Sequence, residues 1–144
     1  MTSQNFKNHT RLLLGWHGIT ALAILALLIC SLINLYYSTY NWQAHFTAAL
    51  LVITAIALCF MFWFIRVFAL KAQDRAIRAE ENLRHFALTG KLLDSRLRIG
   101  QIVALRFAAD EEFVALANKT AEENMSSKAI KQAIVNWKAD YHRV

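Results

Sequence analysis

The sequence predicts an all-α protein: a transmembrane helical hairpin, an extension of the second span, and a small unit of about three short helices. Two apolar runs, residues 12–35 and about 44–68, predict the hairpin. Each exceeds the roughly 20 apolar residues that an α-helix needs to cross a bilayer core. The rest contains no proline and no convincing strand-like alternation. We expect a tail over residues 1–10, the hairpin over 11–70, the extension over 71–88 and the short helices over 89–144.

Basic residues flank the two runs on one side only. Lys7 and Arg11 precede the first run, and Arg66 and Lys71 lie at the end of the second, whereas the loop at 34–43 has no charged residue. Because cytoplasmic loops are rich in Lys and Arg, we expect both termini in the cytoplasm. The loop is too short to form a domain, which excludes a ligand-sensing domain on the other side.

The residues of the two spans predict close helix packing, and they predict no transport pathway, cofactor site or metal site. Gly15, Gly18 and Ala26 are small residues that let a second helix approach closely. No Asp, Glu or Lys lies near the middle of either span, which argues against a channel, proton relay or transporter. His17 and His45 lie at opposite ends of the spans. We therefore expect no haem or other cofactor and no metal site.

The second helix is expected to continue past the membrane, because no proline or glycine interrupts residues 69–88. Gly90 is expected to end it. Apolar residues repeat at intervals of four and three, as in a packed or coiled helix face: Ala72, Ala76, Ala79, Leu83 and Phe86. We expect this stripe to be an interaction face, most simply for a second copy of the chain. Docking of Val103 or Phe113 from the same chain is the alternative.

Two of the short helices are predicted from cap residues and buried positions. The first is expected to start after Asp94 and to run to about Phe107. The second is expected to start at Asp110, whose carboxylate would cap it, and to end near Asn124. Asp110 and the next two residues form an acidic cluster. Acidic residues are favourable in the first turn of a helix, and this explains the cluster fully.

The third helix is expected to be capped by Ser126 or Ser127. Its expected buried stripe is Ile130, Ile134, Trp137 and Tyr141. Basic residues accompany it and form a candidate basic face: Lys128, Lys131 and Lys138. A helix-turn-helix-like regulator that binds nucleic acid from the membrane is therefore a second interpretation. No fork of base-reading side chains is visible, so a solvated helix face is favoured.

Motifs of catalysis are absent. The sequence contains no phosphate-binding glycine loop, no serine-hydrolase elbow, no zinc-protease motif and no redox cysteine pair. We expect no enzyme, no catalytic residue and no small-molecule substrate.

Three strings in the second half of the chain carry a family resemblance. They are residues 101–108 (QIVALRFA), 110–113 (DEEF) and 127–137 (SKAIKQAIVNW), followed by Asp140 and Arg143-Val144. Together they resemble an uncharacterised family of small two-span bacterial membrane proteins, and the resemblance covers nearly the whole chain. It implies a protein of the bacterial cytoplasmic membrane, and no activity or ligand. Ala129 departs from the pattern, because the family commonly has Glu there.

The sequence therefore favours a membrane-anchored scaffold or accessory subunit that self-associates or docks a partner through its cytoplasmic helices. Membrane lipid and a second copy, or a larger membrane complex, are the expected partners. Nucleic acid is not expected. The net charge is +6, but all 10 acidic residues lie from Asp74 onward among the basic ones, which is not the dense basic face of a nucleic-acid-binding protein.

Overall fold

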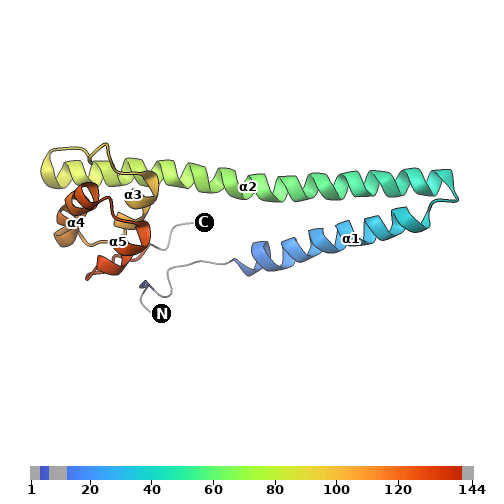
Figure 1. Ribbon diagram of the computed structural model, residues 1–144, viewed down its shortest axis with the longest axis horizontal. Coiled ribbons are helices and arrows are strands. Elements are labelled where there is room, and N and C mark those ends of the chain that lie inside the picture. Colours follow the sequence, from blue (N-terminus) through green and yellow to red (C-terminus); the bar gives the residue numbers. More distant parts are fainter. Residues whose placement is uncertain (1–3, 7–12, 141–144) are drawn as a thin grey trace. The chain divides into compact units, whose positions relative to one another are not determined.

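The computed structural model describes residues 4–6 and 13–140 (Figure 1). Its elements are η1 (Leu14–Thr20), α1 (Ala21–Tyr37), α2 (Trp42–Thr89), α3 (Ile99–Leu105), α4 (Asp110–Glu123) and α5 (Ser127–Ala133). The predicted all-α fold is confirmed: the described residues add only an isolated bridge between Ala108 and Trp137. The chain divides into two compact units, Leu12–Phe68 and Met1–Arg11 with Ala69–Val144.

The unit Leu12–Phe68 holds the first apolar run and the apolar part of α2. Leu14–Tyr37 and Trp42–Thr89 are both long and apolar enough to cross a membrane. The first turns form the π-helix η1, in which the Thr20 hydroxyl donates to the Gly15 carbonyl oxygen at 2.9 Å. Asn41 starts α2, because its side-chain oxygen accepts from the backbone N–H groups of Gln43 and Ala44 at 3.0 and 3.2 Å.

Helix α2 ends where the sequence predicts. Its last residue is Thr89, and Gly90 has a φ of 72°, a left-handed conformation that favours glycine. The Gly90 N–H donates to the Phe86 carbonyl oxygen at 2.7 Å, and the His85 imidazole lies 2.7 Å from the Lys91 carbonyl oxygen. The first bond satisfies one of the last carbonyl oxygens of α2, and the second holds the chain just beyond the helix against its last turn.

The short helices share one apolar core, whose most deeply buried large side chains include Leu97, Ile102, Leu105, Phe113 and Ile130. The predicted start of the first helix is wrong, because Asp94 forms a turn instead: its carboxylate accepts from the Arg96 N–H at 2.8 Å. Helix α3 begins five residues later, where the Gln101 side chain accepts from the Arg98 N–H at 2.7 Å. A side-chain bond thus sets the start of α3.

Helix α4 begins at Asp110 and ends at Glu123, as predicted, with Asn124 in the left-handed conformation. The predicted cap is wrong, because Ala109 holds the cap position without a side-chain bond. For α5 the Ser126 cap is confirmed: its hydroxyl accepts from the Ala129 N–H at 3.1 Å.

Helix α5 ends at Ala133, so the predicted helical stripe through Trp137 is wrong. The chain becomes extended at Ile134, and the Val135 and Asn136 N–H groups donate to the Glu112 carboxylate at 3.0 and 2.9 Å. Trp137 then pairs with Ala108 and stacks on the Phe107 ring at 4.8 Å. Tyr141 lies outside the described residues.

The N-terminal segment belongs to the same unit as the short helices. The Gln4 side chain bonds the backbone of Asp140 twice: it accepts from the N–H at 2.8 Å and donates to the carbonyl oxygen at 3.3 Å. Residues before the first apolar run therefore contact residues that follow the second.

Candidate interaction site on helix α2

The part of α2 that follows Phe68 has one buried face. Ile77, Glu81 and His85 are 5%, 7% and 7% exposed. At roughly 100° per residue these positions lie on one side of the helix. Two of the three are polar, and His85 meets the Phe113 ring edge-on at 6.0 Å. The short helices therefore pack on a mixed polar face of α2.

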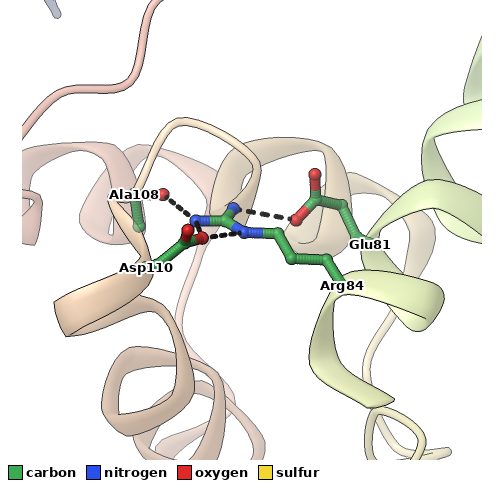
Figure 2. Close-up of polar contacts among 4 residues, drawn as sticks. All are labelled: Glu81, Arg84, Ala108 and Asp110. Carbon is green, nitrogen blue, oxygen red and sulfur yellow. Dashed lines mark hydrogen bonds and ion pairs between the residues drawn. The ribbon is translucent and has the colours of Figure 1, made fainter. Parts of the chain in front are cut away.

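Arg84 joins α2 to the start of α4 (Figure 2). Its guanidinium donates to Asp110 Oδ1 at 2.6 Å, to Glu81 Oε2 at 3.1 Å and to the Ala108 carbonyl oxygen at 2.7 Å. It also lies 4.2 Å from the centroid of the Phe113 ring. One side chain thus binds two carboxylates, a backbone carbonyl and an aromatic face. The sequence alone offers no signal that joins Arg84 to a residue outside its own helix.

Glu81 is the buried carboxylate of this network. Burial raises the pKa of Glu81, while the neighbouring Arg84 guanidinium acts in the opposite direction and holds the increase down. Burial and the Arg84 guanidinium thus act in opposite directions on the pKa of Glu81, and burial has the larger effect.

The strings that carry the family resemblance supply further polar connections of this unit. Gln101 is buried and donates to the Met125 carbonyl oxygen at 2.9 Å, which ties α3 to the turn before α5. Arg106 pairs with Asp140 at 3.2 Å, and Glu112 holds the extended segment after α5. These contacts hold the short helices together.

An open pocket of about 290 Å³ lies beside α2 in the same unit. Its lining is mostly charged: Ile77, Glu80, Glu81, Arg106, Lys138, Ala139 and Asp140. The acidic and basic side chains are mixed, and Arg106 and Asp140 already pair across it. Within residues 4–6 and 13–140, no group of three His, Cys, Asp or Glu side chains is arranged to hold a metal ion.

The predicted interaction stripe lies on the face of α2 opposite to the buried one. All five members are exposed: Ala72, Ala76, Ala79, Leu83 and Phe86. Leu83 is 67% exposed and Phe86 is 52% exposed. The alternative in which Phe113 covers this stripe is wrong, because Phe113 packs under Arg84 and beside His85. Val103 is half-buried in α3.

The other predicted site residues are spread over the chain. Gly15 and Ala26 are exposed and Gly18 is half-buried, whereas the most buried small residues of that unit are Ser31, Ala48 and Ala55.

The candidate basic face does not lie on one helix. Lys128 and Lys131 are on α5, and the Lys131 amine lies 5.6 Å from the centroid of the Phe107 ring. Lys138 lies on the extended segment beyond α5, where it lines the pocket with three carboxylates.

Comparisons with known proteins place the chain in a family and add no activity. No curated protein and no solved structure matches it. One family model matches residues 1–144, and the chain therefore belongs to the Family of unknown function (DUF6526).

Proposed function

We propose that this protein is a membrane-anchored scaffold or accessory subunit of the bacterial cytoplasmic membrane. Both termini lie in the cytoplasm, and the unit that contains the short helices offers the exposed stripe of α2 to another helix. The stripe is defined as Ala72, Ala76, Ala79, Leu83 and Phe86. The protein acts by holding partners together and carries out no chemical reaction.

Three observations support the membrane anchor. Both apolar helices expose large side chains along the spans, including Leu22, Ile53 and Phe60, as expected of helices that lipid surrounds. Lys and Arg flank the spans on one side only. The bonds between Gln4 and Asp140 join residues that precede the first span to residues that follow the second, which is consistent with both termini on one side.

The exposed stripe is the observation that carries the scaffold role. The short helices cover one face of α2 through Ile77, Glu81 and His85, and they leave Leu83 and Phe86 in solvent. Large apolar side chains exposed in a row at helical spacing are typical of an interface for another helix.

The second interpretation, a nucleic-acid-binding regulator, has less support. Helix α5 is only 7 residues long, and Lys138 lies outside it. Carboxylates surround Lys138 in the pocket, and they would repel a phosphate backbone. A salt titration separates the two, because binding to nucleic acid weakens steeply as salt rises.

The test compares membrane association and assembly size in one set of samples. Wild-type protein should resist alkaline extraction from membranes and run as an assembly larger than one chain in mild detergent. Ala76→Glu with Ala79→Glu should split the assembly and leave extraction unchanged. The matched control is Ala115→Glu with Asn118→Glu, which adds the same charge at two exposed positions of α4. Release of the wild type by alkali, or equal assembly in all three proteins, would contradict the proposal.

A further inference from the structure

The exposed stripe of α2 has the spacing of a coiled-coil seam. Ala76 and Leu83 take the a positions of two successive heptads, and Ala72, Ala79 and Phe86 take the d positions. The alanines let two backbones approach closely, while Leu83 and Phe86 supply the large exposed side chains. Leu83 lies about 22 Å of helix past Phe68, at 1.5 Å per residue, so the seam reaches beyond the span.

Charges flank the stripe with opposite sign on its two edges. Arg75 occupies the g position on one edge and Glu80 the e position on the other. Both side chains are exposed, and neither forms an ion pair within the part of the chain that the structure describes. Residues at e and g positions set the partner and orientation of a coiled coil.

The register of these charges fits one arrangement of two copies. In a parallel coiled coil a g residue faces the e residue five positions later on the other helix, and Glu80 lies five positions after Arg75. An antiparallel pair would set g edge against g edge, so Arg75 would meet a basic or neutral edge. The face is thus complementary to itself in parallel register, as a two-fold symmetric interface requires.

We propose that the stripe binds a second copy of this chain as a parallel, in-register coiled coil, with Arg75 of each copy facing Glu80 of the other. The inference rests on the proposed function, because two copies anchored in one membrane enter the cytoplasm in the same direction. The buried face with Glu81 and His85 stays with its own short helices, so each copy keeps its fold while the stripes meet.

Cysteine cross-linking in native membranes tests the register. The full chain without Cys30 and Cys59 carries one cysteine at a time, Ala76→Cys or Leu83→Cys, with Arg78→Cys as the exposed control outside the seam. Both seam cysteines should give a cross-linked dimer, at least about tenfold more than the control. Identical positions two turns apart both meet only in a parallel pair. Cross-linking at one position alone, at neither, or to a different protein would overturn the proposal.

A charge exchange tests the role of Arg75 and Glu80. Arg75→Glu alone and Glu80→Arg alone each place like charges together, and each should weaken self-association about tenfold, since two pairs are lost and two repulsions gained. The two variants mixed, with different epitope tags, should pair with each other at wild-type strength. The double variant should also recover, which would exclude misfolding as the cause. Equal association of all variants would overturn the proposed register.

The two levels of the proposal fail in different ways. If alkali extracts the wild-type protein, the membrane scaffold is wrong. If the chain stays in the membrane and assembles but neither seam cysteine cross-links to a second copy, only the parallel self-association is wrong.

Discussion

At the scale of single residues, Arg84 determines how the short helices meet α2. Its partners come from three places: Glu81 on its own helix, the Ala108 carbonyl oxygen and the Asp110 carboxylate. Arg84 and Glu81 are largely buried, whereas Asp110 is exposed. A buried ion pair adds little net stability over an apolar pair, but removal of one partner leaves the other charge in a poor solvent. Arg84 therefore contributes specificity of docking as well as hydrogen bonds.

Replacement of Arg84 should loosen α4 from α2. Arg84→Ala is expected to lower the stability of the unit with the short helices by about 2–3 kcal/mol, the value for charged hydrogen bonds lost from a partly buried site. Arg78→Ala, an exposed arginine of the same helix, should cost about 0.5 kcal/mol or less. Hydrogen exchange of α4 amides in detergent at rising urea measures both. Equal losses in the two variants would show that Arg84 makes no special contact.

The raised pKa of Glu81 gives the unit a pH dependence of defined sign. Burial raises the pKa, so the folded chain binds the Glu81 proton more tightly than the unfolded chain. Stability should then rise as pH falls from neutral through the raised value, and this increase is complete below the ordinary glutamate pKa. Glu81→Gln should remove it from the hydrogen-exchange stability profile. Glu111→Gln, at an exposed site of α4, should retain it. An increase that persists in Glu81→Gln would assign it to another group.

At the scale of elements, local residue types predicted the end of α2 and the start of α5. Gly90 ends α2 through its positive φ, and the Ser126 hydroxyl caps α5. The start of α3 was predicted wrongly although local bonds set it: the Asp94 carboxylate accepts from the Arg96 N–H, and the Gln101 side chain accepts from the Arg98 N–H. Two further predictions failed where a distant side chain takes part. Asp is a common helix-cap residue, but the Asp110 carboxylate binds Arg84, which is 26 residues away in sequence. Glu112 fixes the extended segment that follows α5, and no local pattern marks that segment as non-helical.

Replacement of Trp137 tests whether its contacts hold the extended segment after α5 in place. Its ring stacks on Phe107, and its backbone pairs with Ala108. Trp137→Ala should destabilise the unit by about 2–4 kcal/mol, from lost burial and the lost aromatic pair. Val135→Ala, two residues earlier and strongly exposed, should stay within about 0.5 kcal/mol. Protease resistance of the full chain in detergent gives the comparison. Wild-type resistance of the tryptophan variant would mean that the stacked pair does not hold the segment.

At the scale of the whole molecule, the sequence predicted the two apolar helices and the exposed stripe, but it did not predict the face of α2 that the short helices cover. The repeat of apolar residues at intervals of four and three identifies apolar helix faces only, so it pointed to the face with Leu83 and Phe86. The covered face contains Glu81 and His85, whose burial depends on Arg84, Phe113 and Lys91 as partners. Those partners come together only in the folded chain, so the polar network of the candidate site could not be read from spacing.

The orientation of the hairpin is the prediction that concerns the entire chain. Lys7, Arg11, Arg66 and Lys71 flank the spans on one side, and the loop that contains Asn41 has no charged residue, so the loop should face away from the cytoplasm. In a chain without Cys30 and Cys59, Asn41→Cys should react with a membrane-impermeant maleimide in whole cells. A cysteine at Val144 should react only after lysis, because the same rule keeps the C-terminal residues inside. Reaction of Val144→Cys in intact cells, with protection of Asn41→Cys, would reverse the topology and would place the exposed stripe of α2 outside the cytoplasm.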